Sequence, residues 1–357
     1  VANVIYQFTD GYDQLLEKYS NDYQNYDKYL EEITKNKINL LKHNCVFFEA
    51  KRGIDYYDEC KKDELGKLKN IEKKYNILFR NKKREIGNIV SCKTVIPTQY
   101  WAESIFPKEK NPLDKLWEIY FQITLANVDD AIDKWNHRIE DIQSRVKYLD
   151  LQQFKSLIFI TRKSRLDVEL VENHKWTGGC EITNTGIRYM PNFPTQEIFT
   201  APKKTGITGM MCNTKPLCYG GRIIDDFQLN FKNGKVINYY PKDNHSIIDE
   251  IINLDESNHY PGEIAILPGE TEISKTCVVF QSTLLDENAA CHLALGCAYP
   301  CSINHEIKFE KEEFEKLGLN YSNYHIDVMF GDDSITIQAI SKNNEIKLLM
   351  ENGEWRV

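Results

Sequence analysis

The first 150 residues carry hydrophobic positions at helical spacing. Leu15, Leu16, Tyr19, Tyr23 and Tyr26 follow one another mostly at steps of three or four. This is the repeat of one face of an α-helix, and a stripe of this kind is typical of core packing. The pattern predicts an amphipathic helical segment near the start of the chain.

Short runs of strand type separate the helical stretches. The runs NCVFFEA at 44–50 and SCKTVIP at 91–97 are rich in β-branched and aromatic residues, and a long helical stretch extends from Pro112 to about Tyr148. Alternation of helices and strands favours an α/β domain. We therefore expect an N-terminal α/β domain with a largely parallel sheet at residues 1–180.

From about Trp176 the pattern changes to strand-type alternation, and Gly, Thr, Asn and Pro become frequent. The run 220–240 predicts two strands joined at Asn233-Gly234, a strong hairpin signal. Residues 181–357 are thus predicted to form a β-rich C-terminal domain, which makes the whole chain a two-domain α/β plus α+β protein. Four further runs predict strands: EIAILPG (263–269), TCVVFQST (276–283), YHIDVMFG (324–331) and ITIQAIS (335–341).

Composition narrows the class of protein. Forty-five Lys and Arg against 53 Asp and Glu give a net charge of −8, and basic clusters such as Lys82-Lys83-Arg84 are short, so a nucleic-acid partner is not expected. No apolar run approaches the ~20 residues that a membrane span needs. The ten cysteines include no CxxC pair, which favours reduced thiols in the cytoplasm.

The chain opens at Val1 with the run VANVIYQF, which alternates loosely like a strand and lacks an initiator Met. From this we expect that an N-terminal segment is absent from the sequence.

The C-terminal half holds carboxylates and histidines in apolar surroundings. Glu197 and Glu263 stand next to apolar runs, where an unpaired carboxylate is very costly. His325 and Asp327 share one face of a predicted strand because side chains alternate along it. His292, in AACHLALGCAY, has no polar neighbour in sequence. The candidate metal ligands are Glu197, Glu263, Glu287, His292, His325 and Asp327.

Each of these residues also has a purely structural interpretation. A single histidine in an apolar segment is commonly a core residue, and a buried Glu commonly pairs with an Arg, here Arg188 or Arg222. Residues 286–288 could cap a helix. The combination favours a metal centre, because six oxygen and nitrogen ligands without Cys suit two adjacent hydrolytic ions of Zn, Co or Mn.

Long motifs in the same half resemble a known family. They are PNFPTQEIFTAP, KPLCYGGRIIDDFQLNFKNGKV, PGEIAILPGETEISKT, STLLDENAACHLALGCAYP and HIDVMFG. Together they resemble the aminopeptidase T and aminopeptidase S family, the thermophilic-type metalloaminopeptidases. The similarity extends over nearly the whole chain and includes Trp101, Trp117 and Trp135 in the first half.

The resemblance implies a cytoplasmic, homodimeric exopeptidase that releases N-terminal amino acids from peptides with broad specificity. It implies two divalent ions, Zn or Co, with Mn or Mg as alternatives, and no membrane partner. Carried over by position, the ligands are Glu197, Glu263, His292, His325 and Asp327, with Glu287 as a further ligand. Glu263 and Tyr299 match the positions that act in catalysis. Gln196 departs from the family, whose members often have an acidic residue there. The resemblance also implies that the first strand and helix of the N-terminal domain are missing from this sequence.

Two alternatives stay open at this point. A dipeptidase or an amidase would use the same metal site, and a non-catalytic metal-stabilised binding protein would hold the same ligands in a closed site. Structural zinc usually recruits Cys, so a carboxylate-rich set favours the hydrolytic interpretation.

Overall fold

The computed structural model describes residues 5, 10–43, 45–54, 61–86, 89–219, 222–241, 245–304, 307 and 309–357. The chain forms two compact units, Val1–Leu113 with Glu181–Pro191, and Asp114–Cys180 with Asn192–Val357. Residues 114–180 therefore group with the second unit, whereas the sequence places a domain boundary near residue 180. That boundary stays a prediction.

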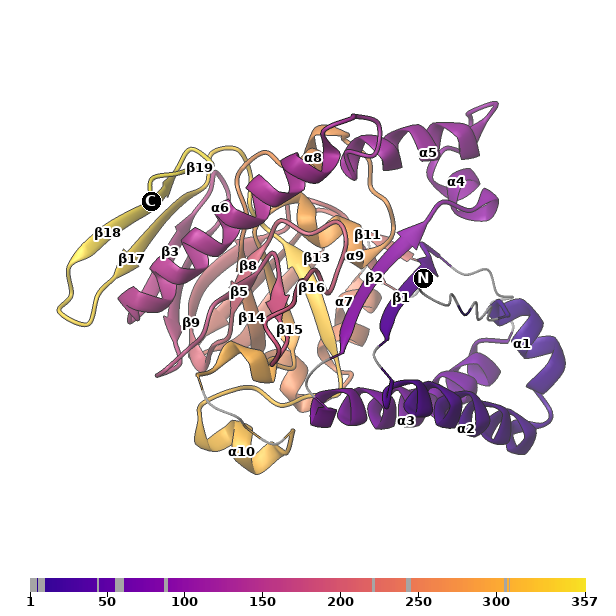
Figure 1. Cartoon of the computed structure of the whole chain (residues 1–357). Coiled ribbons are helices and arrows are strands. Elements are labelled where there is room, and N and C mark those ends of the chain that lie inside the picture. Colours follow the sequence, from indigo (N-terminus) through magenta and orange to yellow (C-terminus); the bar gives the residue numbers. More distant parts are fainter. Residues whose placement is uncertain are drawn as a thin grey trace. The chain divides into compact units, whose positions relative to one another are not determined.

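The first unit is built from helices and a parallel strand pair (Figure 1). β1 (Val46–Arg52) pairs in parallel with β2 (Val90–Ile96), at the two runs where the sequence predicts strands. A larger parallel sheet stays a prediction. The predicted strand VANVIYQF lies outside the described residues except for Ile5. The other elements of this unit are α1 (Tyr12–Tyr19), α2 (Tyr23–Leu40), α3 (Lys62–Ile86), α4 (Gln99–Ile105) and the hairpin of β6 (Glu181–Ile182) and β7 (Arg188–Tyr189).

The predicted helical stripe near the start of the chain is confirmed. Leu15, Leu16 and Tyr19 of α1 and Tyr26 of α2 are buried in one apolar cluster, against Leu65 and Leu68 of α3. The spacing of three and four residues thus places these side chains on the faces where the three helices meet.

The second unit contains an eight-stranded antiparallel sheet with the order β13-β12-β9-β4-β3-β17-β18-β19 (Figure 1). β3 and β4 come from residues that the sequence assigns to the N-terminal domain. The strands are β3 (Ser156–Ile160), β4 (Arg165–Leu170), β9 (Pro202–Cys212), β12 (Phe227–Lys232), β13 (Lys235–Pro241), β17 (Thr336–Ile340), β18 (Ile346–Glu351) and β19 (Glu354–Trp355).

A five-stranded antiparallel sheet has the order β16-β15-β14-β8-β5. One hydrophobic core joins it to the larger sheet, and Ile142 and Leu149 of α6 (Ala131–Gln152) belong to that core. The strands are β5 (Thr177–Gly178), β8 (Ile198–Thr200), β14 (Pro261–Ile266), β15 (His292–Gly296) and β16 (His325–Met329).

The hairpin predicted at Asn233-Gly234 is confirmed between β12 and β13. Asn233 has φ 51° and Gly234 has φ 75°. Two consecutive residues with positive φ are the requirement of the tight turn that matches strand twist, and Asn followed by Gly meets it at the lowest steric cost.

The strand predicted at 276–283 is wrong. Cys277 and Gln281 have φ 54° and 59°, so the chain turns twice there. The remaining elements are α5 (Pro112–Ile123), β10 (Leu217–Tyr219), β11 (Arg222–Ile224), α7 (His245–Ile252), η2 (Glu256–His259), α8 (Glu272–Lys275), α9 (Thr283–Asp286), η3 (Glu287–Ala289), η4 (Pro300–Ser302) and α10 (Lys311–Lys316).

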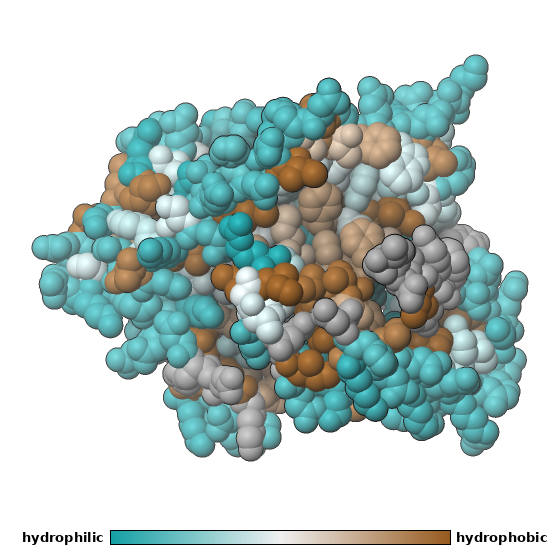
Figure 2. Space-filling view, in the orientation of Figure 1, coloured by the Kyte–Doolittle hydropathy of each residue, from teal (hydrophilic) through white to brown (hydrophobic). Residues whose placement is uncertain are grey.

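Hydrophilic side chains dominate the visible surface along α6, in keeping with a helix that buries one face only (Figure 2). Within the described part of the chain, no helix is long and apolar enough to cross a membrane.

Candidate metal centre

The five-stranded sheet has one apolar face and one polar face. On β14, Ile264 and Ile266 are fully buried in the core, and the alternating positions Glu263 and Ala265 point the other way. The same alternation runs along β15 and β16. The polar face therefore carries Glu263, Ala265, His292, Ala294, Gly296, His325 and Asp327.

Strand register brings these side chains together. Glu263 is paired with Ala294, and Ala294 is paired with Asp327 on the other side. His292 is paired with Ala265. Because directly paired residues of an antiparallel sheet point to the same face, residues up to 64 positions apart in sequence converge on one patch of the sheet.

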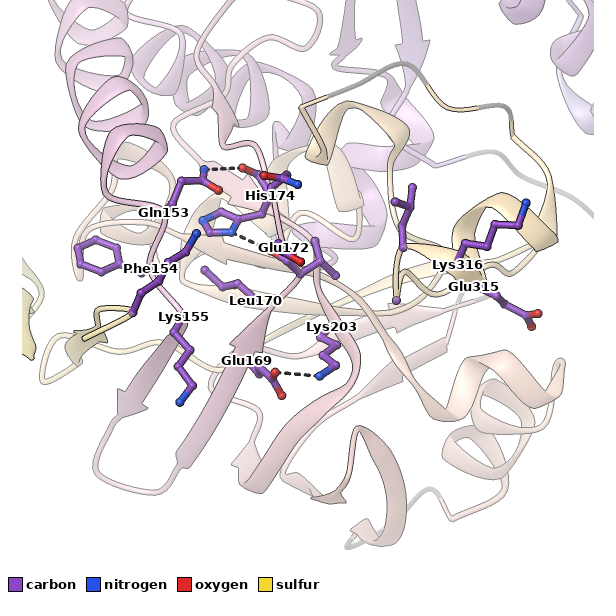
Figure 3. Close-up of a pocket in the computed structure, with 15 residues that line it drawn as sticks. Gln153, Phe154, Lys155, Glu169, Leu170, Glu172, His174, Lys203, Glu315 and Lys316 are labelled. Atoms are coloured by element: carbon purple, nitrogen blue, oxygen red, sulfur yellow. Dashed lines mark hydrogen bonds and ion pairs between the residues drawn. The ribbon is translucent and has the colours of Figure 1, made fainter. Parts of the chain in front are cut away.

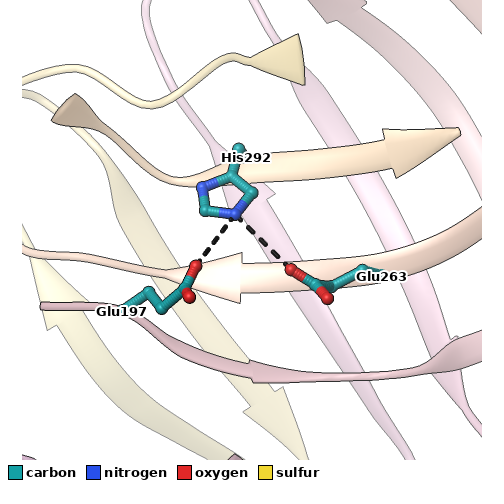
Figure 4. A group of neighbouring side chains, drawn as sticks. All are labelled: Glu197, Glu263 and His292. Carbon is teal, nitrogen blue, oxygen red and sulfur yellow. Dashed lines mark ion pairs between the residues drawn. The ribbon is translucent and has the colours of Figure 1, made fainter. Parts of the chain in front are cut away.

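The first group of possible ligands is Glu197, Glu263 and His292 (Figure 4). His292 Nε2 lies 3.3 Å from Glu197 Oε2 and 3.5 Å from Glu263 Oε1. Glu197 directly precedes β8, and Glu263 and His292 lie on the neighbouring strands β14 and β15. One ligand atom from each residue lies within 4.8 Å of the other two.

The second group is Glu263, His325 and Asp327. His325 Nε2 lies 3.3 Å from Asp327 Oδ1 and 3.7 Å from Glu263 Oε2. Glu263 belongs to both groups, with Oε1 toward His292 and Oε2 toward His325. A single carboxylate therefore faces both histidines.

Backbone carbonyls fix the orientation of both imidazoles. Nδ1 of His292 lies 3.2 Å from the Ala290 carbonyl oxygen, and Nδ1 of His325 lies 2.7 Å from that of Cys297. A carbonyl only accepts, so Nδ1 carries the proton in each ring. In the neutral ring the lone pair is then on Nε2, which faces the carboxylates, and this is the usual arrangement of histidines that bind metals.

These residues fit a divalent cation. Glu197, Glu263, His292 and Asp327 are at most 8% exposed, and neither His292 Nε2 nor Glu263 Oε2 has a hydrogen-bond partner within the described residues. Buried carboxylates require a balancing positive charge. Carboxylate and imidazole donors without thiolate suit Zn, Co or Mn.

Burial and neighbouring charges shift the pKa values of the side chains in the cluster. Burial raises the pKa of Glu263. Burial alone would lower the pKa of both histidines, but Glu197 and Glu263 hold the pKa of His292 well above 6.5, and Asp327 raises that of His325 to about 9. Burial also opposes the charge of Asp327, yet His325 holds its pKa below 3.8. The carboxylates therefore favour the protonated form of both imidazoles.

Tyr299 lies at the edge of the cluster. Its ring centroid is 4.4 Å from that of His325 and 6.0 Å from that of Phe199, and its side chain is 39% exposed. Desolvation, together with the negative charge of Glu263 and Asp327, raises the pKa of Tyr299 well above 10. The phenol therefore keeps its proton and can donate it in a hydrogen bond.

Glu287, in η3, belongs to neither compact group of described residues. Burial and the negative charge of Glu197 and Asp327 raise its pKa well above 4.5, so the carboxyl group interacts electrostatically with the cluster. Its role as a ligand stays a prediction.

The structural alternatives can be compared with the contacts. Arg222 pairs with Glu250 at 2.5 Å, so this arginine balances a carboxylate outside the cluster. Asp286 accepts the backbone N–H groups of Phe280 and Ser282 at 2.8 and 3.0 Å, so it holds a loop in place.

Sequence reasoning missed the two carbonyls that orient the histidines, since any residue type supplies a carbonyl. It also missed Ala294, the small residue between Glu263 and Asp327.

A separate pocket of about 500 Å³ lies on another part of the second unit (Figure 3). It is lined by residues 153–155 before β3, by the end of β4 and the residues that follow it, by β9 and by the end of α10, and includes His174, Lys203 and Glu169. None of its lining residues belongs to either ligand group.

Comparison with known proteins decides the family. The sequence model of the family described as thermophilic metalloprotease (M29) matches residues 9–355. The chain belongs to the thermophilic metalloprotease (M29) family. The resemblance inferred from the motifs is therefore confirmed, and every candidate site residue lies within the matched range.

Proteins similar to this chain carry aminopeptidase names. The chain is 37% identical over 262 residues to Aminopeptidase 2 of Geobacillus stearothermophilus. The match covers 73% of this chain and 63% of that protein. It is 33% identical over 276 residues to Aminopeptidase T of Thermus thermophilus, covering 76% and 67%. The matched region thus spans about two thirds of the length of these relatives.

A solved structure, wild-type AmpT from Thermus thermophilus, has the same fold. The TM-score is 0.80 at 26% sequence identity, with 91% of this chain and 80% of that chain covered. The mixed α/β architecture of this M29 family member is thereby supported over most of its length.

Proposed function

We propose that this M29 family member is a metal-dependent aminopeptidase that releases N-terminal amino acids from peptides by two-metal hydrolysis with broad specificity. The observation that carries the proposal is the pair of buried carboxylate and histidine groups that share Glu263. The aminopeptidase names of the relatives support the same reaction class. Because the match covers 63% of Aminopeptidase 2, activity, substrate and partners all belong to the proposal.

One ion would be held by Glu197, Glu263 and His292, and the other by Glu263, His325 and Asp327, with Glu287 as a further ligand. Zn or Co suits this donor set best, and Mn or Mg are alternatives. When bound, such ions polarise a carbonyl oxygen and lower the pKa of water toward neutrality.

The protein's own residues would then orient the substrate and move protons. Glu263, with an oxygen toward each histidine, would help to hold the ions or would accept a proton from the attacking water. Tyr299 would donate its phenol proton in a hydrogen bond to the oxyanion that develops on the scissile carbonyl.

Exopeptidase action requires recognition of a free α-amino group. The free amine of the substrate would coordinate one of the bound ions or donate a hydrogen bond to one of the three buried carboxylates of the cluster. An N-blocked peptide lacks this group and would not be cleaved.

The test is a chelation and restoration experiment. The protein is stripped with a chelator, assayed with amino-acid anilides, and assayed again after Zn or Co is added back. We expect activity to disappear and return. Activity that survives complete metal removal would rule out the mechanism.

A substrate panel separates this function from its neighbours. Dipeptides, longer peptides and N-blocked peptides are compared with the same metal-loaded protein. Cleavage restricted to dipeptides indicates a dipeptidase, and cleavage of blocked substrates indicates an amidase. Binding of metal with no turnover on any of them indicates a binding protein.

A homodimer and a cytoplasmic location complete the proposal. Light scattering of the purified protein and fractionation of the producing cells test them, and neither result affects the assignment of the metal centre.

A further inference from the structure

The second ligand group depends on a short backbone segment, residues 296–299. The Cys297 carbonyl fixes His325 Nδ1 at 2.7 Å, and Tyr299 packs its ring against the His325 ring at 4.4 Å. β15 ends at Gly296, so Cys297 and Tyr299 lie beyond the last paired residue of the strand. One backbone hydrogen bond continues the pairing beyond Gly296, from the Cys297 N–H to the Tyr324 carbonyl at 2.7 Å. The Cys297 carbonyl and Tyr299 need further support.

Asn320 forms hydrogen bonds with this segment on both sides of Cys297. Its side-chain amide donates to the Gly296 carbonyl at 2.7 Å, and its backbone carbonyl accepts the Ala298 N–H at 2.9 Å. Cys297 is the residue between these two contacts. Together with the hydrogen bond from the Cys297 N–H to the Tyr324 carbonyl, these two contacts set the position of the carbonyl that orients His325.

The same amide ties the segment to the loop before β14. Asn320 Nδ2 lies 2.8 Å from the Ser257 carbonyl oxygen and 3.1 Å from that of Tyr260. The Tyr260 carbonyl in turn accepts the Gly296 N–H at 2.8 Å. Two amide hydrogens thus serve three carbonyls, which fixes the amide orientation because its oxygen would repel all three.

Burial makes these contacts hard to replace by water. Asn320 is 0% exposed, and its Oδ1 has no hydrogen-bond partner in the described part of the chain. Gly296 allows the close approach: it has φ 102°, and a Cβ there would come within 2.3 Å of the Tyr324 carbonyl oxygen. Leaving a buried amide oxygen unpaired costs stability, so the other contacts of Asn320 must offset that cost.

The first ligand group has a different support. His292 is oriented by the Ala290 carbonyl, on the opposite end of β15 from the 296–299 segment. Loss of the Asn320 contacts should therefore disturb one ligand group and leave the other in place.

We propose that Asn320 is a positioning residue for the His325 half of the metal centre, acting through the Cys297 carbonyl and Tyr299. The inference rests on the proposed two-metal function. It assigns to a residue outside both ligand groups the task of supporting one ion site and not the other.

The experiment compares the metal content of Asn320→Ala with that of the wild type. We expect the wild type to bind two equivalents of Co or Zn, and Asn320→Ala to keep one while its affinity for the other falls about tenfold or more. Dialysis against graded free metal with elemental analysis gives both affinities, and the visible absorption of bound Co reports the altered coordination. Asn213→Ala is the matched control, because Asn213 is also buried and its amide also donates to a backbone carbonyl, that of Lys215 at 3.0 Å.

Equal affinities in Asn320→Ala and wild type would overturn the proposal, and so would equal weakening of both ions. If Asn320→Ala fails to fold by near-ultraviolet circular dichroism, Asn320→Ser keeps one donor and is judged by the same two outcomes. A wild type that binds both ions but cleaves no peptide would defeat the proposed peptidase function and leave the role of Asn320 standing. A wild type that binds no ion would defeat both.

Discussion

Glu263 on β14 and Asp327 on β16 face each other across Ala294 of β15 in a single row of the sheet. Neighbouring strands lie about 4.8 Å apart, so the two carboxylates must reach over the middle strand to meet. The methyl group of Ala294 leaves that space open. A side chain that takes part in no ligation thus determines whether the cluster has room for a cation.

Ala294→Leu should remove metal binding while every ligand is still present. The added carbons would occupy the space between Glu263 and Asp327, and overpacking of this kind typically costs about 1–3 kcal/mol of stability. Metal content after equilibration with Zn or Co measures the effect. Leu293→Ala is the control, since Leu293 points into the core: it should lower stability by about 2–5 kcal/mol and keep both ions. Full occupancy in Ala294→Leu would contradict this view of the site.

Glu263→Gln and Glu197→Gln should differ in their metal stoichiometry. Glu263 belongs to both ligand groups and Glu197 to one, so we expect the first change to weaken both ions and the second to weaken one. Both variants should fold, because an amide has the size of the carboxyl it replaces. Elemental analysis and anilide hydrolysis are the measurements, with turnover abolished in Glu263→Gln. Identical losses in the two variants would show that Glu263 is not shared.

The sequence could predict those features of the site that depend on the alternation of side chains along one strand. His325 and Asp327 are two residues apart in a run of apolar residues, so their common face follows from the sequence alone. The order of the strands in the sheet does not follow from the sequence. The order β16-β15-β14-β8 brings His292 and Glu263 next to Asp327, and no local sequence pattern specifies that order. The chemistry of the ligands was predictable, but their grouping was not.

Local patterns also failed where tertiary contacts override them. The run 276–283 has strand composition, yet the Asp286 carboxylate takes the backbone N–H groups of Phe280 and Ser282 that a strand would give to its neighbour. In the same way, Leu157 and Phe159 of β3 alternate like any half-buried strand, and only the fold places them in the sheet of the second unit.

Metal binding should release protons, and the apparent affinity should rise with pH. In the metal-free protein Asp327 raises the pKa of His325 to about 9, so this ring is protonated at pH 7 and must lose its proton before Nε2 can bind a cation. Affinity at the His325 site should therefore increase about tenfold per pH unit for each displaced proton up to about pH 9, and then level off. Titration calorimetry with Mn in two buffers of different ionisation enthalpy counts the protons. A pH-independent affinity between pH 6 and 9 would contradict the assignment.

Tyr299→Phe should separate the chemical step from metal binding. The substitution keeps the ring that packs on His325 and Phe199 and removes only the phenol hydroxyl. If that hydroxyl stabilises the developing oxyanion, kcat should fall by ~10²–10³ with little change in KM, as for removal of a single oxyanion donor. Metal content should match the wild type, whereas Tyr299→Ala, which also removes the ring beside His325, should lower it as well. Unchanged kcat in Tyr299→Phe would mean that the oxyanion is stabilised without the tyrosine.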